Sequence, residues 1–97
     1  MSFATVVKKE NPTLQDIDST KDPAVAIFSD GTTLDFPKGC KFEPDHVEDP
    51  NGKIIGRCLR VHQPLVDGKP GGPSFVIPQY CSVQNVKTAI ERVEKGV

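Results

Sequence analysis

The sequence lacks tryptophan and contains a single methionine and a single tyrosine among its 97 residues. Hydrophobic residues make up 36% of the chain, and no apolar run approaches the roughly 20 residues that a membrane-spanning helix requires. The first residues also lack the charged-then-apolar pattern of a secretory signal. These absences predict a soluble, cytoplasmic protein with a modest core and no membrane partner.

Cysteine is also scarce, and the three cysteines have no Cys-x-x-Cys spacing (Cys40, Cys58 and Cys81). An odd number of widely spaced thiols does not indicate a disulfide framework, so we expect reduced cysteines that pack as small hydrophobic side chains. The formal net charge of -1 provides no overall attraction to nucleic acid or to an anionic membrane. A local basic patch is still compatible with this charge.

What the chain does contain is proline and glycine, nine and eight residues respectively. This composition argues against a helical bundle and for many turns. A chain of this length is large enough for one core, so residues 1–97 are predicted to form a single domain.

Residues 53–62 form the longest stretch of strand-like composition, and we predict that they are the central strand of the sheet. Strict alternation along this stretch leaves neither face cleanly apolar. A bulge near Arg57 and Cys58 would repair the pattern and turn Leu59 and Val61 toward the core.

Other strands are predicted on either side of this stretch. Residues 24–28 and 32–36 flank Asp30-Gly31, a strong hairpin signal. Further strands are expected at residues 3–9 and 74–77, with a short extension at residues 40–42. Residues 13–23 are expected to be turn-rich with one short helical turn, and residues 43–52 and 64–73 to be loops.

The C-terminal stretch Val83–Lys95 has the periodicity of an amphipathic helix. Ser82 is a suitable N-cap and Gly96 a suitable C-cap. The apolar stripe consists of Val83, Val86, Ile90, Val93 and Val97.

These elements predict an α+β fold with a small, mainly antiparallel sheet of four to six strands, open or curled toward a barrel, and one C-terminal amphipathic helix. Side chains from the hairpin, the central strand, the last strand and the helix should share one core. The expected core residues are Leu34, Phe36, Leu59, Val61, Phe75, Ile77, Val86 and Ile90.

No residue pattern indicates catalysis. Cys58 and His62 lie about 13 Å apart along a strand, at about 3.3 Å per residue, and therefore cannot form a nucleophile–base pair. The segment Gly68–Pro73 lacks the spacing of a phosphate-binding loop. Whether the acidic residues 45–49 around His46 bind a cation is left open. We therefore assign no enzyme activity, no cofactor and no metal ligand.

The remaining function is a small intracellular module that binds another protein or a second copy of itself. The alternative is a small nucleic-acid-binding β-barrel, whose basic central hairpin would contact phosphates while aromatic side chains stack on bases. Nucleic acid is the less favoured partner, because acidic residues dilute the basic patch. The candidate binding residues are Arg57, Arg60, His62, Asp67, Lys69 and Tyr80.

Overall fold

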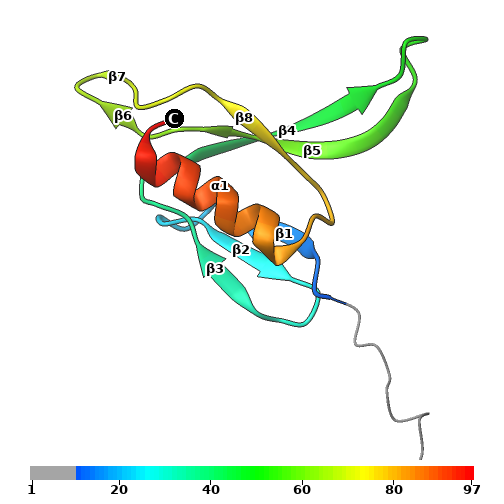
Figure 1. The fold of residues 1–97 in the computed structure, drawn as a ribbon, viewed down its shortest axis with the longest axis horizontal. Coiled ribbons are helices and arrows are strands. Elements are labelled where there is room, and N and C mark those ends of the chain that lie inside the picture. Colours follow the sequence, from blue (N-terminus) through cyan, green and yellow to red (C-terminus); the bar gives the residue numbers. More distant parts are fainter. Residues whose placement is uncertain (1–10) are drawn as a thin grey trace, which may run out of the picture.

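The computed structural model describes residues 11–97 and shows an α+β fold (Figure 1). The strand expected at residues 3–9 lies outside the described residues. Within this part of the chain, the elements are β1 (Leu14–Asp18), β2 (Val25–Phe28), β3 (Thr33–Asp35), β4 (Lys41–Glu48), β5 (Ile54–His62), β6 (Leu65–Val66), β7 (Lys69–Pro70), β8 (Phe75–Pro78) and α1 (Val83–Lys95).

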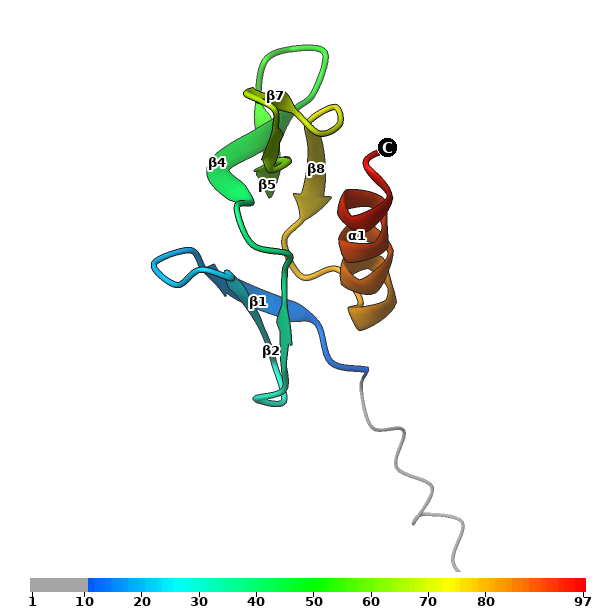
Figure 2. The ribbon, with the colours of Figure 1, turned by 90° about the vertical axis from the view of Figure 1, so that its left-hand side faces the viewer.

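The strands form two three-stranded antiparallel sheets, β1-β2-β3 and β4-β5-β8, and a two-stranded ribbon, β6-β7. Figure 2 shows α1 running beside the two sheets. The α+β class, the antiparallel pairing and the C-terminal helix are thus confirmed. The expected single sheet of four to six strands is instead divided into two sheets of three strands each. The sheets remain open over residues 11–97, so the barrel-like alternative is wrong.

The hairpin expected around Asp30-Gly31 is confirmed. Gly31 adopts a φ of +88°, which glycine tolerates, and Asp30 Oδ1 accepts a hydrogen bond from Thr32 N–H at 3.0 Å. The helical turn expected within residues 13–23 is wrong, because β1 pairs there with β2. Leu14 and Ile17 of β1 are buried in the core, although their polar neighbours suggested a loop.

The hairpin β4-β5 contains the central strand, as expected, but residues 43–48 are a strand rather than a loop. β4 is an edge strand, and Pro44 is tolerated because its missing N–H would point away from β5. The bulge also differs from the expectation near Arg57 and Cys58. The register shifts between Val47 and Glu48, leaving Ile55 without a directly paired residue.

β8 pairs with the C-terminal half of β5, as expected for the strand at residues 74–77. The connection at residues 64–73 is not a plain loop, since it folds into the ribbon β6-β7. Asp67 and Gly68 form its turn with φ angles of +53° and +80°.

α1 has the expected caps. Ser82 Oγ accepts a hydrogen bond from Asn85 N–H, and Gly96 closes the C-terminus in the left-handed conformation. The helix buries Val86, Ala89 and Val93.

One hydrophobic core joins both sheets and the helix. Phe36, which follows β3, and Phe42 on β4 meet edge to face with ring centroids 5.0 Å apart, linking the two sheets. The expected core is confirmed, with Phe36, Val61, Ile77 and Val86 buried and Leu34, Leu59, Phe75 and Ile90 packed around them. Leu14, Ile17, Ala26 and Phe28 belong to the same core.

Candidate functional site: the β4-β5 arm and the sheet beside it

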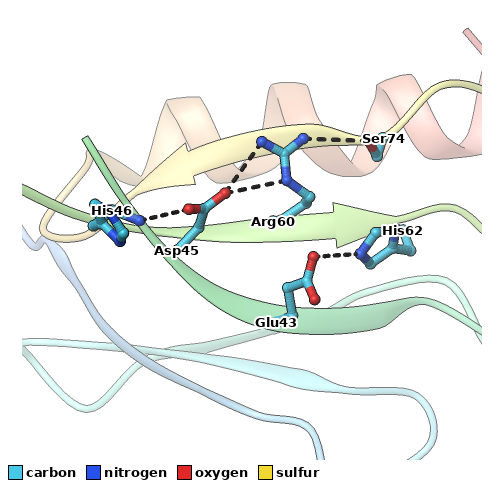
Figure 3. Close-up of polar contacts among 6 residues, drawn as sticks. All are labelled: Glu43, Asp45, His46, Arg60, His62 and Ser74. Carbon is cyan, nitrogen blue, oxygen red and sulfur yellow. Dashed lines mark hydrogen bonds and ion pairs between the residues drawn. The ribbon is translucent and has the colours of Figure 1, made fainter. Parts of the chain in front are cut away.

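Two of the predicted binding residues, Arg60 and His62, lie on the face of the β4-β5-β8 sheet opposite α1 (Figure 3). Arg60 bonds to Asp45 on β4, with Nη2 and Nε 3.1 and 3.2 Å from Asp45 Oδ2, and donates from Nη1 to Ser74 Oγ at 3.3 Å. Arg60 therefore connects β4 to the segment that leads into β8. Because its guanidinium is already paired, Arg60 is less available to an external phosphate or carboxylate.

The second pair on this face joins His62 Nε2 and Glu43 Oε1, 3.1 Å apart. A further histidine on β4 forms a similar pair, with His46 Nε2 lying 2.8 Å from Glu48 Oε1. All four side chains are more than 40% exposed, so these pairs contribute little to stability.

Asp45 also closes part of the free edge of β4. Its Oδ1 accepts a hydrogen bond from the N–H of His46 at 2.8 Å. This hydrogen bond lowers the pKa of the Asp45 carboxyl, with the Arg60 guanidinium adding to the effect. Since Pro44 has no N–H, two donors that would otherwise face solvent along this edge are absent or occupied.

The other predicted binding residues are dispersed. Arg57 is exposed on β5 beyond the residues that pair with β8. Asp67 and Lys69 lie at the end of the ribbon β6-β7, while Tyr80 is 59% exposed beside β1, where its N–H donates to Leu14 O. The fold thus does not assemble the six candidates into one surface.

The most exposed apolar side chains of the long hairpin lie at its free end, where Arg57 is the one predicted binding residue. We call residues 46–57 the arm, and Figure 1 shows the hairpin extending past the rest of the fold. β8 pairs only with Cys58–Val61 of β5, so this part of β5 has no third strand beside it. Val47, Ile54 and Ile55 on the arm are 48%, 58% and 62% exposed.

The turn at the end of the arm is held by Asp49. Its Oδ1 accepts hydrogen bonds from the N–H groups of Asn51 and Lys53, both at 2.9 Å. Its own N–H donates to Lys53 O, and Gly52 adopts a φ of +83° that completes the turn. The arm is therefore ordered by its own hydrogen bonds, and it would lose little conformational entropy on binding a partner.

Charge is divided between the two strands of the arm. Glu48 and Asp49 lie on the β4 side, and Lys53 and Arg57 lie on the β5 side. The apolar side chains are consequently flanked by acidic residues on one strand and basic residues on the other.

Comparison with known proteins adds no assignment. The chain matches no protein-family model, no curated protein and no solved structure. The evidence for function is therefore the geometry of the chain itself.

Two further features bear on chemistry. Over residues 11–97, no group of three or more His, Cys, Asp or Glu side chains is placed to hold a metal ion. The acidic residues 45–49 bond instead to Arg60, His46 and the turn of the arm. In the same part of the chain, no helix has the length and apolarity to cross a membrane.

The three cysteines are free thiols, with Cys58 and Cys81 buried and Cys40 half-buried. Burial raises the pKa of the Cys40 thiol, with a further contribution from the charge of Asp22. Burial also raises the pKa of the Cys81 thiol. Both thiols therefore contain less thiolate at neutral pH than an exposed cysteine, which disfavours a nucleophilic role.

A hollow of about 650 Å³ lies between His62 and the ribbon. Its inner wall includes Gln63, whose Nε2 donates to Pro73 O and Val97 O at 2.9 and 2.8 Å. Gln63 Oε1 is buried and has no hydrogen-bond partner within residues 11–97. The two donated hydrogen bonds fix the orientation of this amide, so Gln63 serves to hold the connection before β8 against the C-terminal residue.

Sequence reasoning missed the arm because the composition of residues 53–62 predicts one central strand along its whole length, with a neighbouring strand on each side. The exposure of Ile54 and Ile55 depends on where β8 stops pairing with β5, and no local pattern encodes this end point. A usable signal was the failure of either face of residues 53–62 to be cleanly apolar.

Proposed function

We propose that the protein is a non-catalytic, self-associating module, and that the arms of two copies form the contact. The observation that carries this proposal is the exposure of Val47, Ile54 and Ile55 on an ordered hairpin that reaches beyond the core. Clustered exposed apolar side chains bordered by charged residues are typical of protein interaction surfaces.

The charge pattern favours a second copy as the occupant. When two arms stack face to face about a twofold axis that runs along their length, the arms are parallel and the β4 side of one arm faces the β5 side of the other. Glu48 and Asp49 of one copy then approach Lys53 and Arg57 of the other, in both halves of the contact. A self-complementary surface of this kind needs no second protein.

The contact is made by side chains rather than by strand addition at β4. Pro44 and the bond between Asp45 and His46 N–H remove two donors from that edge. The free thiols fit a reducing compartment, so the proposal places the protein in the cytoplasm. No specific observation favours the nucleic-acid alternative, since Arg60 is paired and Arg57 and Lys69 lie on different hairpins.

Sedimentation velocity over about 1 μM to about 1 mM, the range of moderate to weak association, tests the proposal. The weight-average sedimentation coefficient of the native protein should rise with concentration. The double variant Ile54→Ser, Ile55→Ser should remain monomeric over the same range.

The matched control changes two apolar side chains of similar exposure on the ribbon, Leu65→Ser and Val66→Ser. This variant should associate as the native protein does. A native protein that stays monomeric throughout would refute self-association, and equal effects of the two double variants would refute the role of the arm.

A further inference from the structure

The four outer edges of the two sheets differ in how far they are closed. β1 is covered at Leu14, whose N–H donates to Cys81 O and whose carbonyl accepts from Tyr80 N–H. The N–H of Ile17 on the same strand donates to Asp16 Oδ1. β3 is only three residues long. β4 is closed by Pro44 and Asp45. The fourth edge belongs to β8.

β8 directs the main-chain groups of Val76 away from β5. Gln79 N–H donates to Arg57 O on β5. Because main-chain groups alternate in direction along a strand, the N–H and C=O groups of Ile77 and Phe75 also point to β5. Val76 therefore presents both its N–H and its C=O at the free edge, and Pro78 presents its C=O. These groups are the template that an added strand would use.

A groove runs between this edge and α1. It has a volume of about 210 Å³ and is lined by Phe75–Pro78 of β8 and by one stripe of the helix, Asn85, Thr88, Ala89 and Arg92. The stripe follows the i, i+3, i+4, i+7 spacing of a helix face. Small-molecule pockets usually measure about 300–1,000 Å³, so the groove is better matched to one or two side chains of an extended peptide.

The charge of the groove indicates which kind of peptide side chain it would prefer. Arg92 is the one charged side chain that lines the groove within residues 11–97. Its guanidinium lies over the Phe75 ring at 4.5 Å from the centroid, and its Nε donates to Val97 O at 3.1 Å. Stacking on Phe75 orients the guanidinium at one end of the groove, where its remaining N–H groups can donate to a carboxylate.

We propose that the β8–α1 groove binds an extended peptide of another protein, which adds as a strand to β8, places an apolar side chain over Ala89 and directs a carboxylate to Arg92. Val76 N–H and C=O supply the main-chain hydrogen bonds, and Arg92 supplies the preference for an acidic residue. The groove uses none of the arm residues, so this binding goes beyond self-association and does not depend on it.

The test is an NMR titration of the ¹⁵N-labelled protein with two libraries of blocked pentapeptides. The first four positions vary over Val, Ile, Leu and Thr, and the last is Glu in one library and Gln in the other. At about 1 mM total peptide, the Glu library should shift the amide resonances of Phe75–Ile77 and of the α1 stripe. Hydrogen exchange at Val76 N–H should slow at the same time.

Two helix variants with the same change of charge separate recognition from general electrostatics. Arg92→Gln should weaken binding of the Glu library by about threefold or more, as expected for a partly exposed charged pair. Lys87→Gln, which is exposed on α1 but does not line the groove, should leave it unchanged. Absence of shifts at β8 and α1 with either library would overturn the site. Equal binding of both libraries would overturn the role of Arg92.

Discussion

The backbone N–H of His46 donates a hydrogen bond to Oδ1 of Asp45, 2.8 Å away, on an edge strand whose preceding residue is Pro44. Together the two residues remove consecutive outward-facing donors from the middle of β4. Natural sheets use such features to prevent edge-to-edge pairing. The middle of β4, the longest edge strand within residues 11–97, therefore offers no free N–H group to an added strand, while the apolar arm beyond it stays open to a partner.

Restoring both outward-facing N–H donors of β4 should make this edge strand prone to aggregation. In the double variant Pro44→Thr, Asp45→Thr, the N–H groups of residues 44 and 46 become available for pairing with another chain. We expect increased thioflavin T fluorescence and a larger insoluble fraction than for the native protein. The variant Asp45→Asn keeps Pro44 and an acceptor for His46 N–H, and it should behave as the native protein does. Equal solubility of the double variant and the native protein would argue against a protective role.

Asp45 should also contribute to acid sensitivity. The hydrogen bond from His46 N–H and the Arg60 guanidinium lower the pKa of this carboxyl in the folded state. A lowered pKa means that the contribution to stability is present above the unfolded-state value of about 4 and is lost as the pH falls through the folded-state value.

We therefore expect the melting temperature of the native protein to fall more steeply between about pH 5 and about pH 3 than that of Asp45→Asn. Thermal unfolding followed by circular dichroism measures the difference. Glu91→Gln, on the exposed face of α1, is the control and should follow the native profile. Parallel profiles for the native protein and Asp45→Asn would contradict the assigned interactions.

The helix and the first hairpin could be predicted because their signals are local. Ser82 and Gly96 mark the ends of α1, and Asp30-Gly31 marks the turn between β2 and β3. β4 was missed because proline and a run of acidic residues usually indicate a loop. That reading fails on an edge strand, where every second N–H points to solvent and proline breaks no ladder bond. β1 was missed for a related reason, since only Leu14 and Ile17 of its five residues are buried.

Of the candidate site residues, sequence alone could identify the charged groups but not their partners. Arg60 is neutralised by Asp45 from a neighbouring strand, and that pairing depends on the register of β4 and β5. The exposure of Ile54 and Ile55 likewise follows from the length of β8. Both are relationships between segments distant in sequence.

The core and the arm should respond differently to truncation. Phe36 is 2% exposed and packs on Phe42, so Phe36→Ala should lower the free energy of unfolding by about 3–5 kcal/mol. Ile55 is 62% exposed, so Ile55→Ala should change it by less than about 0.5 kcal/mol. Urea denaturation at a concentration where the protein is monomeric measures both values. A large loss at Ile55 would mean that the arm is part of the folding core.

The thiols should be slow to react in the folded protein. Cys58 and Cys81 are buried, and the pKa values of Cys40 and Cys81 are raised by burial. Ellman's reagent at neutral pH should therefore modify the native protein slowly, with Cys40 the first to react, and should titrate three thiols rapidly in denaturant. Rapid modification of Cys81 in the native protein would contradict its buried position.

The most direct measurement for arm-mediated self-association is charge-swap complementation. One variant reverses a charge on the acidic side of the arm (Glu48→Lys), which leaves the hydrogen bonds of Asp49 in the turn intact, and the other reverses a charge on the basic side (Lys53→Glu). In a contact that joins the β4 side of one arm to the β5 side of the other, each variant repels its own copies. In the mixture, the reversed β4 side of one variant meets the reversed β5 side of the other, and the two unreversed sides meet each other, so attraction is regained in both halves of the contact. Sedimentation velocity of each variant alone and of the equimolar mixture should therefore show two monomeric samples and an associating mixture. Association of either variant alone as strong as that of the native protein, or a mixture that remains monomeric at concentrations where the native protein associates, would contradict the proposed arm contact.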